Sequence, residues 1–112
     1  MIKNILIICC LVIVSKADYK KTLFYGNCTS CHMQVGKKSA PHFSEIKGYY
    51  KVAYPTKKEF VEKLSTWVSH PDKKTAKLPH AIKEYKQVMP YLGIDIEILR
   101  DIAEYLYETD EF

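Results

Sequence analysis

Two cysteines and a histidine form the stretch of this sequence with the most distinctive chemistry. Cys28 and Cys31 are three positions apart, and His32 follows the second cysteine directly. Side chains at positions i and i+3 lie on the same face of a helical turn, so both thiols would face one way. This Cys-x-x-Cys-His spacing is the attachment signature of a c-type haem, in which the two thiols bond to the porphyrin and the histidine binds the iron.

Two other uses of a cysteine pair explain the stretch less well. A redox dithiol of the thioredoxin type would lie near a βαβ pattern, and none is visible in the sequence. A zinc site needs two more ligands at compact spacing, whereas the other histidines are scattered and no second Cys-x-x-Cys pair follows. A disulfide between Cys28 and Cys31 is the remaining alternative in an oxidising compartment, and it leaves His32 without a role.

The first 17 residues predict a secretory signal peptide that is not part of the fold. Lys3 gives a positive start, residues 5–14 are an unbroken apolar run, and small residues precede an expected cleavage after Ala17. The mature domain would then cover residues 18–112. The apolar run is short for a membrane span, so a retained segment acting as a membrane anchor is the alternative.

The composition fits one small domain and gives no reason to expect nucleic acid binding. The 112 residues include 17 basic and 13 acidic side chains, a net charge of +4, and no basic–aromatic recognition pattern appears. The charge is uneven, because residues 37–86 hold 12 lysines and five acids while residues 95–112 hold seven acids and one arginine. Two interpretations stay open: ordinary solvated helix faces, or a basic face that steers association with an acidic partner.

Hydrophobic periodicity predicts an all-α fold of about four to five helices joined by substantial loops. No segment alternates with period two for long enough to be a strand. The clearest starts are a capping box formed by Thr56 and Glu59 and an N-cap at Asp95. The expected helices cover residues 18–32 with Asp18 as N-cap, 43–50, 56–70, one or two turns within 81–87, and a last helix from residue 95.

Haem iron takes a second axial ligand on the face opposite His32, and Met89 is the candidate. It lies 57 residues downstream, in a segment that Pro90 holds extended ahead of a capped helix. A thioether on a flexible side chain suits low-spin iron. Met33 is adjacent to His32 and cannot reach the far face. The alternatives are core packing of Met89 or a histidine ligand, from among His42, His70 and His80.

These residues together resemble a class I cytochrome c, and the small bacterial periplasmic monohaem carriers most. The resemblance covers residues 18–112, with Cys-x-x-Cys-His as its specific motif. The residues that carry it are Phe24, Cys28, Cys31, His32, Pro41, Met89, Pro90 and the stretch 100–106.

The resemblance implies a cytochrome c fold wrapped around one covalently bound haem c. Cys28 and Cys31 would carry the thioethers, and His32 and Met89 would bind the iron. The carbonyl of Pro41 would accept the other ring N–H of His32 and so fix its tautomer.

The resemblance also implies roles for three further residues, and two other residues differ from the family pattern. Phe24 would pack the first helix against Ile102 and Tyr105 of the last. Trp67 would lie over a haem edge or propionate, with simple core packing as the alternative, and His42 would lie near the haem pocket. Two residues depart from the family: Ala40 stands where glycine is common, and Glu104 where alanine is common.

The resemblance implies electron transfer rather than catalysis, because two filled axial positions leave the iron no site for a substrate. We expect a periplasmic monomer that docks weakly and transiently on redox partners, such as membrane cytochrome complexes, terminal oxidases, and periplasmic reductases or peroxidases. One alternative is a haem enzyme or gas-binding protein with an open sixth site. The other is a membrane-anchored subunit of a respiratory complex.

Overall fold

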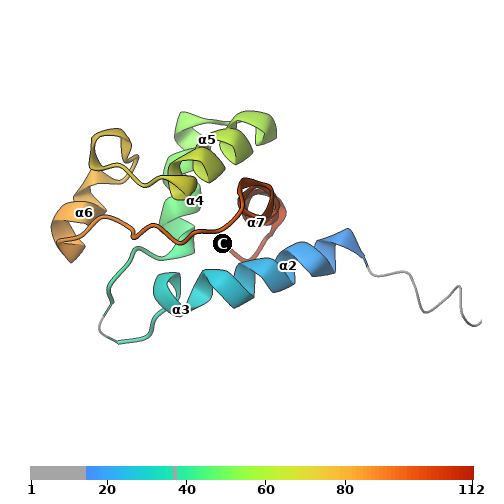
Figure 1. Ribbon diagram of the computed structural model, residues 1–112, viewed down its shortest axis with the longest axis horizontal. Helices are drawn as coiled ribbons and strands as arrows, with labels where there is room; N and C mark the ends of the chain where they lie inside the picture. Colours follow the sequence, from blue (N-terminus) through green and yellow to red (C-terminus); the bar gives the residue numbers. More distant parts are fainter. Residues whose placement is uncertain (1–14, 37) are drawn as a thin grey trace, which may run out of the picture.

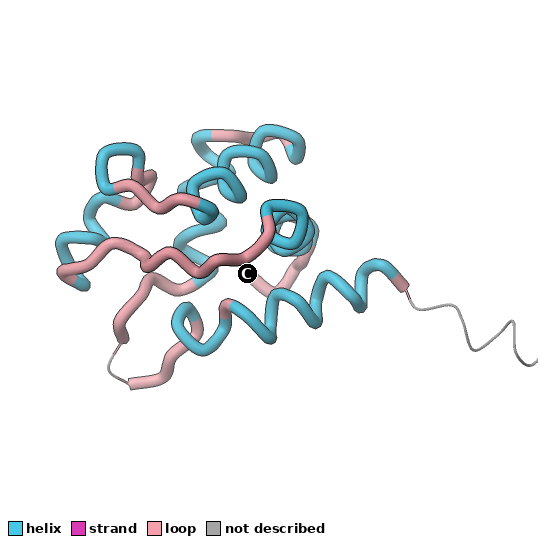
Figure 2. Tube along the Cα trace, in the orientation of Figure 1, coloured by secondary structure: helices cyan, strands magenta, loops and turns pink. Residues whose placement is uncertain are grey.

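Six α-helices and one 3₁₀ turn follow one another in the computed structural model, which describes residues 15–36 and 38–112 (Figure 1). Within those residues there is no strand, which confirms the all-α prediction (Figure 2). None of the described helices has the length and apolar character that crossing a membrane requires. The elements are α2 (Lys16–Asn27), α3 (Thr29–His32), α4 (Phe43–Ala53), α5 (Lys57–Ser69), η1 (Lys73–Thr75), α6 (Pro79–Tyr85) and α7 (Ile96–Glu108).

The start of the first helix differs from the prediction. Ser15, not Asp18, is the N-cap of α2, and its hydroxyl accepts a hydrogen bond from the amide of Ala17 at 3.2 Å. Asp18 instead lies in the first turn, where its charge favours the positive end of the helix dipole. Most of the expected signal peptide, residues 1–14, lies outside the described residues. The cleavage expected after Ala17 stays a prediction and falls in the first turn of α2.

The predicted single helix over residues 18–32 is divided in the structure. Cys28 has φ −121° and ψ −31°, which lies outside the helical region, and it both ends α2 and precedes α3. Its amide still donates to the carbonyl of Phe24 at 3.1 Å, so α2 leads directly into the short turn that carries Cys31 and His32.

Two predicted helix starts are confirmed by their capping hydrogen bonds. The Thr56 hydroxyl accepts from the amide of Glu59 at 3.3 Å, and a carboxylate oxygen of Asp95 accepts from the amide of Glu97 at 3.0 Å. Helices α5 and α7, which begin at these caps, pack closely against each other. Helix α7 also packs against α2 (Figure 1). This packing fixes the framework on which the remaining segments lie.

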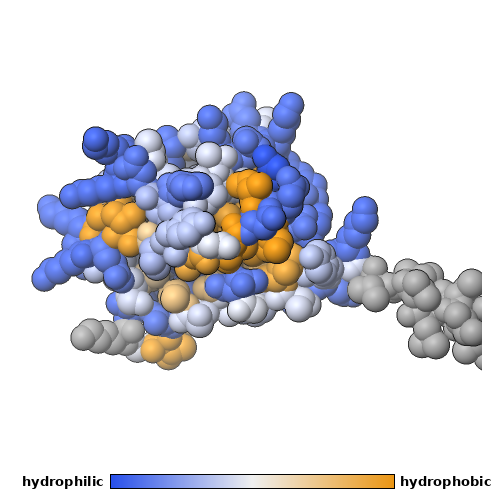
Figure 3. All heavy atoms as spheres, in the orientation of Figure 1, coloured by the Kyte–Doolittle hydropathy of each residue, from blue (hydrophilic) through white to orange (hydrophobic). Residues whose placement is uncertain are grey.

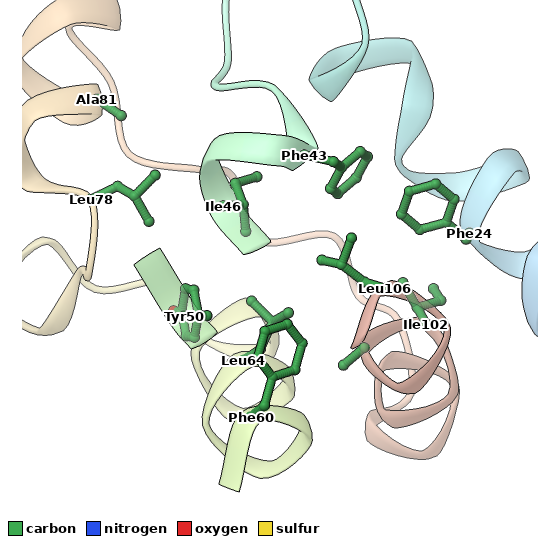
Figure 4. Packing of buried hydrophobic residues seen from close by; sticks show 11 residues of the cluster. Phe24, Phe43, Ile46, Tyr50, Phe60, Leu64, Leu78, Ala81, Ile102 and Leu106 are labelled. Atoms are coloured by element: carbon green, nitrogen blue, oxygen red, sulfur yellow. The ribbon is translucent and has the colours of Figure 1, made fainter. Parts of the chain in front are cut away.

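The crossing of α2 and α7 is centred on Phe24, as predicted. Phe24 is fully buried, and its ring centroid lies 5.0 Å from that of Tyr105 and 4.4 Å from that of Phe43. Ile102 belongs to the same core cluster. Figure 4 shows side chains from α2, α4, α5 and α7 pointing toward one another around this core. Burial of these rings and aliphatic chains is the main stabilisation available to so small a domain.

Glu104 lies on the flank of α7, where two lysines from neighbouring helices meet. Its carboxylate is 2.7 Å from the Nζ atom of Lys20 on α2 and 3.1 Å from that of Lys57 at the start of α5. Hydrogen bonds first from Lys20 and then from Lys57 hold the pKa of this carboxyl below its usual value. The charge of Glu104 therefore joins three helices, which gives a physical reason for an acidic residue at a position where the resemblance predicted a small one.

Candidate haem-binding site

A largely apolar cavity of about 300 Å³ opens among α3, α4, α5, α6 and α7. This volume is at the lower end of the range for small-molecule and cofactor sites, about 300–1,000 Å³. Residues from distant parts of the sequence line it together. They include all five residues singled out from the sequence as cofactor ligands or supports: Cys28, Cys31, His32, Pro41 and Met89.

His32 is held on the cavity wall by a hydrogen bond from its ring. Its Nδ1 atom lies 2.8 Å from the carbonyl oxygen of Pro41, so Nδ1 is the donor and Nε2 carries the free lone pair. Burial lowers the pKa of His32, which favours the neutral imidazole that a metal needs. The ring of Phe43 packs against the imidazole of His32, with the two ring centroids 5.0 Å apart.

Cys28 and Cys31 are both free thiols that line the same cavity. Cys28 is partly buried, and this burial raises its thiol pKa to about 11, so it is protonated at neutral pH. Cys31 is more exposed. The two thiols form no disulfide, so the geometry of the described residues does not favour that alternative.

A zinc site is not supported by the arrangement of side chains either. Among residues 15–36 and 38–112, no group of three or more His, Cys, Asp or Glu side chains is placed to bind one metal ion. The cysteine pair and His32 therefore face the cavity without the further ligands that a structural zinc site needs.

Met89 lies in the extended segment between α6 and α7, is partly buried, and lines the cavity. None of the three histidines considered as alternatives to it, His42, His70 and His80, is among the cavity residues. The structure thus brings Met89, and none of these histidines, to the same cavity as His32.

Each of these three histidines has a different environment. His42 is the N-cap of α4. His70 ends α5, is exposed, and packs its ring against that of Tyr91 with centroids 5.8 Å apart. His80 is exposed and belongs to α6, and its Nε2 atom lies 2.5 Å from a carboxylate oxygen of Glu45.

Comparisons of this chain with models of protein families, with curated proteins and with solved structures gave no match. The interpretation of the cavity therefore depends on its own residues and their geometry.

Two aromatic residues complete the polar part of the cavity wall. Trp67 lines the cavity, but its indole N–H donates to the carbonyl of Asp72 at 3.1 Å, so it already has a partner. Tyr50 is 3% exposed and also lines the cavity, and its hydroxyl has no hydrogen bond to any residue that the structure describes. The expected helix over residues 43–50 ends at Tyr50, whereas α4 continues to Ala53.

These residues fit a covalently attached haem. Two adjacent thiols, a neutral imidazole with its Nδ1 atom already engaged, and a thioether all line one cavity whose other walls are mainly aliphatic and aromatic. The hydroxyl of Tyr50 has no partner among the described residues and is available as a hydrogen-bond donor. Neither a zinc site nor a simple hydrophobic core explains this set of donors in one place.

Proposed function

We propose that this chain is a c-type cytochrome that carries single electrons, with one haem bonded to Cys28 and Cys31 and with His32 and Met89 as axial ligands. The observation that carries the proposal is that these four residues line one apolar cavity although Met89 is far from the others in sequence. When bound, haem c supplies an iron that exchanges one electron by changing between Fe(III) and Fe(II).

His32 would be presented to the ring in one tautomer and one orientation. The carbonyl of Pro41 accepts its Nδ1–H, which leaves Nε2 as the ligand atom and strengthens imidazole as a donor. Pro41 is thus a support of the ligand and would not itself touch the iron.

The remaining cavity walls would exclude water and keep the site apolar. Ile46, Leu64 and Leu106 are buried and contribute aliphatic surface from three different helices. An apolar, water-poor site disfavours the added charge of the ferric state and so raises the reduction potential. A thioether from Met89 acts in the same direction.

Electron transfer suits this arrangement better than catalysis. With Met89 and His32 on the iron, no position is left for a substrate. A haem enzyme with an open sixth site would need a distal acid or base, and none of the three histidines considered above lines the cavity. The proposal is therefore a carrier and not an enzyme.

A carrier of this kind would act in the periplasm as a monomer and dock briefly on other redox proteins. Over α6, on the left of Figure 3, hydrophilic side chains surround a patch of apolar surface. Lys77 lines the cavity, and further lysines lie on η1 and α6. A small apolar contact with a charged border suits weak, fast association with acidic partners.

The deciding experiment is an absorption spectrum of the purified full chain, oxidised and reduced, after export in a host with haem-attachment machinery. We expect a low-spin haem that stays on the chain after denaturation, with the far-red band of a methionine–iron(III) bond. A chain exported by such a host without covalently bound haem would show that the proposal is wrong.

A further inference from the structure

The segment around Met89 is held on both sides by contacts with two different parts of the chain, the loop before α4 and the end of α5. Two residues before Met89, the side-chain amide of Gln87 donates to the carbonyl of Ser39 at 3.1 Å. Two residues after it, the ring of Tyr91 packs against the ring of His70, with centroids 5.8 Å apart. The two contacts thus lie two residues before and two residues after Met89, and they join its segment to two separate parts of the chain.

The wall on the Gln87 side is itself fixed to the turn that carries His32. Ser39 lies between α3 and α4, two residues before Pro41, and both its amide and its hydroxyl donate to the side-chain carbonyl of Gln34 at 2.8 Å. Ser39 and Gln87 both line the cavity. A chain of hydrogen bonds therefore connects the segment after His32 with the segment that carries Met89.

The backbone alone does not fix Met89. Residues 88–95 have no regular secondary structure, and the chain leaves α6 through Lys86 in the left-handed region at φ 56°. Methionine is unbranched with three rotatable bonds, so an ordered main chain is needed to keep its sulfur at one place. When a ligand lies on such a segment, the effective concentration of its binding atom at the site depends on how tightly the two ends of the segment are held.

We propose that Gln87 and Tyr91 are positioning residues that together clamp the Met89 segment across the cavity, so that its thioether outcompetes external ligands for the second axial position. This inference rests on the proposed function, because it concerns how the same site keeps its methionine. Gln87 donates a hydrogen bond to Ser39, on the segment that follows His32. The ring of Tyr91 packs against His70, at the end of α5. Neither residue touches the reacting atoms.

The experiment measures how easily imidazole displaces the methionine in the haem-loaded full chain. Imidazole is titrated into the oxidised protein, and loss of the far-red methionine–iron(III) band reports displacement. A surface contact of this type changes an equilibrium by about threefold to tenfold. We therefore expect Gln87→Ala and Tyr91→Ser each to lower the half-saturating imidazole concentration by about that factor. The double variant should show roughly the product, because the two contacts go to different parts of the chain and share no partner.

Two control variants separate positioning from a general loss of packing. Tyr91→Phe keeps the ring that packs on His70 and should behave like the wild type. Tyr49→Ser removes another exposed tyrosine, whose ring packs on that of His80 with centroids 5.0 Å apart. Tyr49 lies on α4 and not on the segment that carries Met89, so imidazole binding should be unchanged. The urea midpoint of each variant is measured in parallel, so that weaker folding is recognised as such.

The outcomes distinguish the clamp from the proposed function. If the wild type shows the methionine band but Gln87→Ala and Tyr91→Ser bind imidazole no better than Tyr49→Ser, the clamp is wrong and the carrier stands. If imidazole affinity rises only in proportion to a lower urea midpoint in every variant, the clamp is also wrong. A wild-type protein with haem but without the methionine band contradicts both proposals.

Discussion

The Nδ1 atom of His32 lies 2.8 Å from the carbonyl oxygen of Pro41, which is nine residues away and on another segment of the cavity wall. This one contact determines which ring nitrogen faces the cavity. Because a backbone carbonyl can only accept, the proton is on Nδ1 and Nε2 is free to bind a metal. The resemblance to a class I cytochrome c implied this hydrogen bond, and it is present in the structure.

The first prediction concerns the two thiols. Cys28→Ala or Cys31→Ala should lower the yield of haem-loaded protein to a small fraction of wild type, because each removes one covalent bond to the ring. The core is small, and in the proposed haem-loaded protein the ring would fill the cavity, so the remaining apoprotein should be largely unfolded. Haem staining after denaturing electrophoresis and circular dichroism measure these two effects.

A matched control for the cysteine variants is Met33→Leu. Met33 follows His32 directly and packs at the edge of the core, but it does not line the cavity. Its substitution should leave haem attachment unchanged. An apoprotein of either cysteine variant with native helicity would contradict the expectation that the ring is needed for folding.

The second prediction separates Met89 from the histidines. Met89→Ala should leave the haem attached, because Cys28, Cys31 and His32 are untouched, but it should abolish the far-red band. Loss of the soft thioether favours Fe(III), so the reduction potential should fall by on the order of 0.1 V. The choice of axial ligands can change the potential of a haem by roughly 0.8 V in all. Voltammetry and the ferric spectrum measure both effects.

His80→Ala is the control for the Met89 variant. His80 is exposed, pairs with Glu45 and lies outside the cavity, so its removal should change neither the spectrum nor the potential. If His80→Ala shifts the potential while Met89→Ala does not, the ligation is bis-histidine, and the assignment of Met89 is wrong while electron transfer survives. A high-spin spectrum unchanged by either variant would instead favour the haem enzyme or gas-binding alternative.

Local chemistry explains which features could be predicted from the sequence. The caps at Thr56 and Asp95 depend on side chains that bond to amides two or three residues away, so short patterns reveal them. Phe24 could be placed at the helix crossing from the resemblance. By contrast, the sequence does not single out Ser15 as a cap, because Ser15 falls within the expected signal peptide.

The missed parts of the site depend on contacts between distant residues. Gln87 and Ser39 are 48 positions apart and both are polar loop residues, so no periodicity connects them. Tyr50 stands at the end of the expected helix over residues 43–50, and its position there gives it no place in the site. Phe43, Ile46 and Tyr50 recur at i, i+3 and i+7, however, and this spacing on one helical face was the signal that could have placed Tyr50 with the core.

The third prediction concerns the lysines near the cavity. Lys77→Glu should slow the reaction with an acidic redox partner, mainly by lowering the association rate, because Lys77 lines the cavity and its charge would steer the approach. The effect should shrink as ionic strength rises, since screening acts over about 10 Å at 0.1 M salt. Stopped-flow kinetics across a series of salt concentrations measures this.

Lys58→Glu is the matched control for Lys77. It makes the same charge change in the first turn of α5, whereas the α5 residues that line the cavity begin at Leu64. A separation of six residues along the helix corresponds to about 9 Å along its axis. Equal slowing by both variants, or rates that do not respond to salt, would mean that the lysine-rich region is an ordinary solvated surface.

The last prediction concerns the pH dependence of folding at Glu104. Hydrogen bonds from Lys20 and Lys57 lower the pKa of this carboxyl below that of an ordinary glutamate. A carboxyl with a lowered folded pKa stabilises the protein above its unfolded pKa, and this stabilisation is lost as the pH falls through the folded value. Glu104→Gln should therefore reduce the free energy of unfolding by about 1 kcal/mol at pH 7, since the pair is only partly shielded from solvent.

The difference between Glu104→Gln and wild type should then shrink as the pH is lowered below 4.5 and vanish once the wild-type carboxyl is protonated. Urea unfolding of both proteins at several pH values measures it. Glu62→Gln is the control, because Glu62 is 56% exposed and lies 3.6 Å from Arg100, so it should change stability by less than about 0.5 kcal/mol at any pH. A Glu104→Gln effect that persists unchanged at pH 3 would show that its cause is packing at the α2–α7 crossing and not the charge of Glu104.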